Sequence, residues 1–282
     1  LNLACRVVDG GVITATPVYP PFLSAPKLSG RELTSVPLKL TDEGWCMDLD
    51  AMQAALKADT RLWLLCHPHN PVGRAWSDEE LRAFAGFCRR HDLIVCSDEI
   101  HCDLILDAER RHLPLACVDD EIARRSITLM APSKTFNIPG LACAFAVIPD
   151  AGLRRRFTGA ARGIVPDVNV LGFVAAEAAF REGAEWHRGL IDTLRRNRDR
   201  VEAAVAAMPG LAVTHVEATY LAWIDARGLG VDDPVSFFEA AGVGLSNGAD
   251  FGLPGWVRLN FGCPGATLEA ALQRMEQACR QR

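Results

Sequence analysis

Residues 62–98 read LWLLCHPHNPVGRAWSDEELRAFAGFCRRHDLIVCSD, a short apolar run, a helical pattern and a second short apolar run. The apolar runs at 62–66 and 93–97 are brief and bounded by polar or turn residues, as expected of strands. Between them the spacing predicts a helix over 78–91, with Ser77 as the N-cap of a capping box. Two strands joined by a helix form a βαβ unit, which predicts a parallel sheet.

The alternation of strand and helix continues on both sides of this unit. Residues 11–16 and 127–130 are further short apolar runs, and Asp48 precedes a helical pattern over 49–57 as its expected cap. Repeated units of this kind predict an α/β fold, with a large domain over residues 1–185 that is built on a mostly parallel sheet.

The sequence changes character after about residue 185. Two long helical patterns rich in Ala and Arg cover 170–180 and 185–208, and Pro209 follows the second as a stop signal. Strands are then expected over 212–215, 220–225 and 257–261, and helices over 235–241 and 268–281, the last with Thr267 as its cap. The pattern predicts a smaller α+β domain over residues 186–282.

Composition narrows the class of protein. The chain has 282 residues, 49% hydrophobic and 23% charged, with a net charge of −5, and no basic block points to nucleic acid. No apolar run approaches the roughly 18 residues of a membrane helix, and the first residues do not form a signal peptide. The ten cysteines include no C-x-x-C pair, which indicates reduced thiols and a cytoplasmic location.

Three polar residues follow three of the predicted strands. Asn70 comes after the strand that ends at residue 66, Asp98 directly follows residue 97, and Lys134 follows the strand that ends at residue 130. In sheets of this type, ligands bind beyond the carboxyl ends of the strands. Position alone therefore predicts that these side chains share one pocket.

Lysine and aspartate at those places point to a cofactor. A lysine that forms a Schiff base and an acid that holds a pyridinium nitrogen are the groups that pyridoxal phosphate (PLP) chemistry needs. With its motifs SKTFNIPGL at 133–141, SDEIH at 97–101, HNPVGR at 69–74 and VRLNFGCP at 257–264, the chain resembles the fold-type I, aminotransferase-like PLP enzymes. Within them it is most similar to the cystathionine β-lyase (C–S lyase) branch, and the resemblance implies the aspartate aminotransferase fold.

The resemblance also implies roles for individual residues. Lys134 would hold PLP and Asp98 would keep its ring nitrogen protonated. Asn70 would donate a hydrogen bond to the phenolic oxygen, Tyr19 would stack on the ring, and Arg258 would bind the substrate carboxylate through its planar fork. Two further cofactor contacts are Ser133, beside the phosphate, and His101, where typical aminotransferases of this fold have Tyr.

Each of these residues also has an ordinary structural interpretation. Lys134 and Arg258 could lie on the surface, and Asp98 could cap a helix or form a salt bridge. Asn70 could serve a turn, Tyr19 could be the core aromatic of a Pro-rich loop, and His101 could be a core histidine with one hydrogen bond. Cysteine and histidine gather near residues 66–69 and 96–102, but their spacing matches no standard zinc pattern, so no metal site is expected.

The sequence departs from the family pattern in two places. Ala131 and Ala142 stand where many aminotransferases have a serine and an arginine for the phosphate. Residues 1–8 resemble the end of a helix whose beginning cradles the phosphate in the family. We therefore expect the chain to be a piece of a longer protein, with cofactor affinity in question.

The activity that the resemblance implies is PLP-dependent cleavage of cystathionine or related cysteine S-conjugates to pyruvate, ammonia and a thiol, as in amino-acid metabolism and methionine biosynthesis. His101 in place of Tyr favours this lyase over transamination of an amino acid. The remaining alternative is a non-catalytic PLP-fold regulatory protein. The resemblance implies a homodimer with shared active sites, acting on a small amino-acid substrate.

Overall fold

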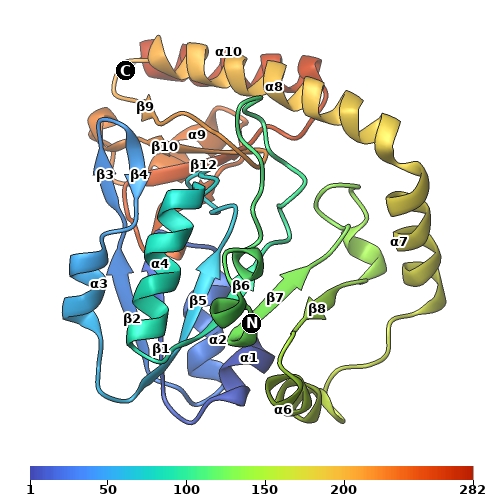
Figure 1. Ribbon diagram of the computed structural model, residues 1–282. Helices are drawn as coiled ribbons and strands as arrows, with labels where there is room; N and C mark the ends of the chain where they lie inside the picture. The colour runs from blue at the N-terminus through green and yellow to red at the C-terminus, as the bar shows by residue number, and fades with distance from the viewer. Residues whose placement is uncertain (282) are drawn as a thin grey trace.

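The computed structural model describes residues 1–281, and their largest sheet has six strands in the order β2-β1-β5-β6-β7-β8 (Figure 1). Neighbouring strands are parallel except at the edge, where β8 runs antiparallel to β7. The strands are β1 (Gly11–Thr16), β2 (Leu33–Pro37), β5 (Thr60–Cys66), β6 (Ile94–Asp98), β7 (Ser126–Met130) and β8 (Phe145–Val147). The predicted α/β fold with a mostly parallel sheet is confirmed.

Alternating side chains of the strands build a core on each face of this sheet. Ile13, Trp63 and Val95 are fully buried on one face, in a cluster that includes helix α4 (Asp78–Arg90). Their neighbours Val12 and Leu62 are buried on the other face, with α1 (Asn2–Val7), α2 (Pro20–Leu28) and α6 (Ala151–Ala161). Each such side chain contributes about 1.5–3 kcal/mol by its burial, which fixes the register of the strands.

Two of the predicted helix starts, those capped by Ser77 and Asp48, are present. Ser77 Oγ accepts from the amide of Glu80 at 3.2 Å, and the Glu80 carboxylate accepts from the amide of Ser77 at 2.8 Å, so the capping box of α4 is complete. Asp48 caps α3 (Leu49–Ala55) by accepting from the amide of Ala51 at 2.9 Å. This helix ends two residues earlier than the expected range of 49–57.

The second half of the chain forms a separate antiparallel sheet in the order β11-β12-β10-β9. In Figure 1, helices α8 and α10 lie along the upper side of the view above this sheet, and α7 descends from the beginning of α8. The elements are α7 (Val170–Glu182), α8 (Ala184–Ala206), β9 (Ala212–Val213), β10 (Leu221–Asp225), α9 (Pro234–Ala240), β11 (Ser246–Asn247), β12 (Trp256–Asn260) and α10 (Gly265–Arg280). The division at residue 185 stays a prediction.

Several local expectations are wrong or incomplete. Thr267 does not cap the last helix: α10 begins at Gly265 with Pro264 as N-cap, because Pro264 sets the chain for the first turn and its carbonyl accepts from the amides of Thr267 and Leu268. The strand expected over 212–215 has only two residues. The sequence did not predict β2, β8, β11, helices α2 and α6, the hairpin β3 (Lys39–Thr41) with β4 (Gly44–Cys46), or the short helix α5 (Asp120–Arg124).

Among the helices of residues 1–281, none is both long and apolar enough to cross a membrane.

Candidate active site

The carboxyl ends of β5, β6 and β7 lie in register. Cys66 pairs with Asp98, and Asp98 pairs with Leu129, so the residues that follow these strands emerge at one edge of the sheet. A cavity of about 180 Å³ opens there. Six of the seven predicted site residues line it: Tyr19, Asn70, Asp98, His101, Lys134 and Arg258. The structure therefore brings together residues that the sequence separates by more than two hundred positions.

Asp98 is a buried acid whose charge has little compensation. Desolvation by burial raises the pKa of its carboxyl to about 6, against the amide of Ile100 and the positive charge of Lys134, which lower it. Its hydrogen bond from the Ile100 amide is long, at 3.4 Å, and within residues 1–281 the carboxylate forms no ion pair. A buried acid of this kind is stabilised by a cationic N–H donor, as a pyridinium nitrogen would supply.

Arg258 joins the two sheets at this cavity. It lies on β12, and its guanidinium donates to Asn70 Oδ1 at 3.0 Å and to Ser246 Oγ at 3.1 Å. The guanidinium also stacks over the ring of Phe251, 4.7 Å from the ring centroid. These partners are neutral, so the charge of the guanidinium is available to a carboxylate ligand. Among residues 1–281, Arg258 Nε has no hydrogen-bond partner.

The bond from Arg258 also fixes the amide of Asn70. Because Asn70 Oδ1 accepts from the guanidinium, the Nδ2 group is the end that remains as a donor for a ligand oxygen. The backbone of this residue is held as well, since its carbonyl accepts from the amide of Tyr19 at 3.1 Å. Tyr19 itself is 37% exposed and is the N-cap residue of α2, so its ring stands at the cavity rather than in the core.

His101 is buried and uncharged. Burial, with the positive charges of Lys134 and Arg258, lowers the pKa of its imidazole to about 3. Its ring meets the ring of Tyr220 edge-on at 5.7 Å, and its buried Nδ1 atom has no hydrogen-bond partner within residues 1–281. The pair forms a neutral aromatic wall of the cavity.

Ser133 differs from the other predicted residues. Within the described part of the chain, the residues that line the cavity do not include it. Its carbonyl accepts from the amide of Ile138 at 3.1 Å, which closes the turn that carries Lys134. Its role at a phosphate stays a prediction.

Sequence reasoning missed lining residues from the second sheet. Asn260 lies two positions after Arg258 on β12, so a period of two would have placed both on the same face. Tyr220 had no such signal: it follows Thr219, whose φ of 74° is uncommon for a residue with a side chain. Tertiary contacts hold this turn, because the amide of Thr219 donates to the carbonyl of Leu104 at 2.8 Å.

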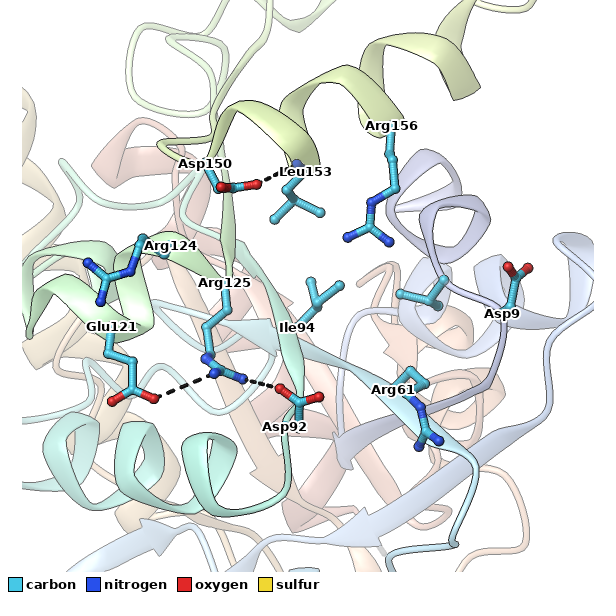
Figure 2. Close-up of a pocket in the computed structure, with 11 residues that line it drawn as sticks. Asp9, Arg61, Asp92, Ile94, Glu121, Arg124, Arg125, Asp150, Leu153 and Arg156 are labelled. Carbon is cyan, nitrogen blue, oxygen red and sulfur yellow. Dashed lines mark hydrogen bonds and ion pairs between the residues drawn. The ribbon is translucent and has the colours of Figure 1, made fainter.

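A larger hollow, of about 510 Å³, lies where the sheet strands begin, with Ile94 at the start of β6 (Figure 2). Its lining includes four arginines and four carboxylates, so the charges balance. Figure 2 shows Arg125 between two of them, with hydrogen bonds of 3.0 Å to Asp92 and 3.5 Å to Glu121. Arg125, Asp92 and Glu121 satisfy one another, and Arg156 donates to the carbonyl of Val7 at 3.3 Å.

The histidines near residues 66–69 serve the backbone. His67 Nε2 bonds to the carbonyl of Leu113 at 3.1 Å, and His69 Nε2 bonds to the carbonyl of Pro17 at 2.8 Å. Across residues 1–281, no three His, Cys, Asp or Glu side chains gather as a metal site would require.

Comparisons with known proteins agree with this geometry. Cystathionine beta-lyase PatB of Bacillus subtilis (strain 168) is 35% identical over 275 residues, covering 95% of this chain and 71% of PatB. The crystal structure of OvoB is 50% identical with a TM-score of 0.98 and covers 100% of this chain and 75% of that one. Cystalysin from Treponema denticola, whose crystal structure contains pyridoxal 5'-phosphate, is 30% identical with a TM-score of 0.93, covering 99% and 74% of the two chains.

The family described as aminotransferase class I and II matches residues 2–275, nearly the whole chain. The match has the extent that the sequence motifs implied, and it includes both sheets and all seven predicted site residues. The chain belongs to the aminotransferase class I and II family.

Proposed function

We propose that this chain is a PLP-dependent carbon–sulfur β-lyase that cleaves cystathionine or related cysteine S-conjugates. The observation that carries the proposal is the convergence of Lys134, Asp98 and Arg258 on one cavity. The names of its relatives support the same chemistry, since PatB is a cystathionine beta-lyase and the cystalysin structure contains the cofactor.

The residues present fit pyridoxal phosphate. Asp98 lacks an ion-pair partner among residues 1–281, the Nδ2 group of Asn70 is free to donate, and Tyr19 offers an exposed ring at the cavity. Lys134 would hold the cofactor, Asp98 would keep a proton on its ring nitrogen, and Asn70 would bind its phenolic oxygen. When bound, this cofactor supplies a ring that stabilises negative charge at the α-carbon of an amino acid.

The chain's own groups would then carry out the remaining steps. Arg258 binds the α-carboxylate through its two Nη groups, which fixes the orientation of the α-carbon. Lys134 Nζ, once released from the cofactor, takes the α-proton as general base. The bond between Cβ and sulfur breaks with its electron pair going to sulfur, and hydrolysis of the three-carbon product yields pyruvate and ammonia.

Transamination is the second candidate, since the family also contains aminotransferases. In that reaction the α-proton returns to the cofactor and no thiol is released. The identity of residue 101 favours the lyase, because typical aminotransferases of this fold have Tyr where this chain has His101.

The two reactions differ in their products, which gives the test. The purified chain with added PLP and L-cystathionine should release thiol and pyruvate in equal amounts without an α-keto acid acceptor. Turnover that requires an α-keto acid and releases no thiol would establish the aminotransferase instead. Failure to retain PLP would favour the non-catalytic alternative.

We further propose that two copies form a homodimer with shared active sites and that the protein acts in the cytoplasm. Exposed apolar side chains gather on α7, where Val170, Leu171 and Phe173 are 72%, 66% and 59% exposed, a pattern typical of an interface. The free cysteines support a reducing location. Light scattering on the purified chain should give twice the mass of one copy, and a monomeric mass would contradict the dimer.

A further inference from the structure

The loop that carries Lys134 is closed on itself and docked against the α7–α8 pair. The amide of Phe136 donates to the carbonyl of Pro132 at 2.9 Å, so Lys134 lies inside a tight turn. Further along, the carbonyl of Leu141 accepts from Asn169 Nδ2, the N-cap of α7, at 3.1 Å. A Cβ atom at Gly172, in the first turn of α7, would come within 2.6 Å of the same carbonyl. One end of the loop is thereby tied to the beginning of α7.

The side chain of Phe136 forms the second attachment, at the other end of α7. Its ring stacks on Trp186 with 5.8 Å between centroids and meets Phe180 edge-on at 6.1 Å. Phe180 and Trp186 are 53% and 50% exposed, so these rings are not part of a buried core. Phe180 and Trp186 instead pack against Phe136, which lies two residues after Lys134.

Gly183 makes room for this ring. It stands where α7 ends and α8 begins, and a Cβ atom there would come within 2.5 Å of Phe136 Cε1 and would also meet the carbonyl of Ala179. Its backbone is in the ordinary helical region, with φ of −77°, so glycine is not needed for its conformation. Because Gly183 has no side chain, it leaves room for the ring of Phe136 and for the last turn of α7.

We infer that Phe136 and Gly183 are positioning residues, which together hold the Lys134 loop against the junction of α7 and α8. The consequence for the cofactor rests on the proposed function: a loosened loop would let the lysine turn away from the cavity and would weaken its attachment to PLP. In the part of the chain that the structure describes, the residues that line the cavity include neither Phe136 nor Gly183, so their effect passes through the loop.

Hydrogen exchange of the chain without PLP tests the contact directly. In Gly183→Ala, the amides of Phe136 and Ile138 should exchange about tenfold faster. The added methyl group displaces the Phe136 ring from its packing position, and the turn then opens more often. Gly189→Ala is the matched control, since Gly189 lies in α8 and its Cβ would meet nothing within 4 Å. Unchanged exchange of the two loop amides in Gly183→Ala overturns the inference.

A second variant separates this contact from a general effect on the helix end. Phe136→Leu should loosen the same amides, and the double variant should be no worse than either single one, because both remove one contact. Additive effects would show that Gly183 acts on the helices and not through Phe136, and would overturn the inference.

The link to the cofactor is read from borohydride trapping of the PLP adduct at Lys134. Gly183→Ala and Phe136→Leu should need about tenfold more PLP than the wild type for half-maximal trapping. Equal requirements would overturn the positioning role even if exchange changed. A wild type that traps no PLP at Lys134 would contradict the proposed function, while the exchange data would still decide whether the two residues hold the loop.

Discussion

Asp98 shows at the scale of one residue how this fold prepares a site. The carboxyl sits at the end of a buried strand, where desolvation raises its pKa to about 6 and a single long hydrogen bond offers little compensation. The chain without its cofactor therefore carries an acid that is unfavourable when ionised. A cation bound at this place would remove the penalty, which is the reason to regard this buried carboxylate as functional.

The charge of Asp98 should cost stability in the chain without cofactor. Below about pH 4 the carboxyl is protonated in both the folded and the unfolded state, so Asp98→Asn should change little. Between about pH 4 and 6 mainly the unfolded state ionises, and the wild type loses stability as pH rises; above about pH 6 the variant should be more stable by up to about 3 kcal/mol. Urea unfolding at pH 4 and pH 7.5 measures this, with exposed Asp232→Asn as control; equal stability at both pH values would contradict the account.

The substrate role of Arg258 depends on its fork more than on its charge. Arg258→Lys keeps a cation but loses the two-pronged geometry and the bond that orients Asn70, so KM for L-cystathionine should rise about 10- to 100-fold. Steady-state kinetics check this, beside Arg274→Lys on the exposed side of α10. A larger fall in kcat with KM unchanged would mean that the arginine does not bind the ground-state substrate.

Sequence predicted the residues whose motifs are local and missed those that depend on tertiary contacts. Asp98 ends β6, and Asn70 and Lys134 come four residues after β5 and β7, so strand prediction alone placed them at one edge of the sheet. Tyr220 lies just before β10, in a turn held by contacts distant in sequence: the amide of Thr219 donates to the carbonyl of Leu104, and the amide of Ala218 donates to the carbonyl of Gly73. No local sequence pattern predicts a contact between segments so far apart in the chain.

At the scale of elements, α8 connects the two halves of the site. Its first turn contacts the Lys134 loop through Trp186, and Asn197, which is 2% exposed, donates from Nδ2 to the carbonyls of Phe261 and Cys263 at 2.9 Å each. Those carbonyls lie one and three residues after the end of β12, the strand of Arg258. One helix thus contacts the segments that present the lysine and the arginine.

Removing the Asn197 side chain should lower the stability of the second half of the molecule. Asn197→Ala removes the bond to the carbonyl of Cys263 and one of the two bonds to the carbonyl of Phe261, which also accepts from the amide of Cys263 at 2.8 Å. The free energy of unfolding should fall by about 1–3 kcal/mol. The exposed amide of Gln273 offers a matched control, because Gln273→Ala should stay within about 0.5 kcal/mol of the wild type. Urea titration of both variants gives the comparison. Equal free energies of unfolding for the two variants would show that the buried amide of Asn197 does not stabilise the fold.

Elements with strong periodicity were predictable and short ones were not. The capping box of α4 and the apolar runs of β5 and β6 are complete signals within the sequence. Two-residue strands such as β9 and β11 exist only because a neighbouring strand supplies hydrogen bonds, which no local pattern encodes. The prediction that Thr267 caps the last helix was wrong although the local signal was strong. Threonine is a favoured cap residue, but the helix has Pro264 as its N-cap, three residues earlier.

At the scale of the whole molecule, the cavity lies where the two sheets meet. Lys134, Asp98 and Asn70 come from the parallel sheet, and Arg258, Tyr220 and Asn260 come from the antiparallel sheet or its connections. Neither half holds both the lysine and the arginine. The proposed reaction therefore needs both sheets in their observed arrangement.

The central claim is β-elimination at Lys134, and pyruvate release from L-cystathionine tests it most directly. The purified chain with PLP should form pyruvate, while Lys134→Ala, matched for folding by circular dichroism, should fall by at least about 10³-fold, because the variant lacks both the attachment point and the general base. Pyruvate released by Lys134→Ala at the wild-type rate would contradict the account.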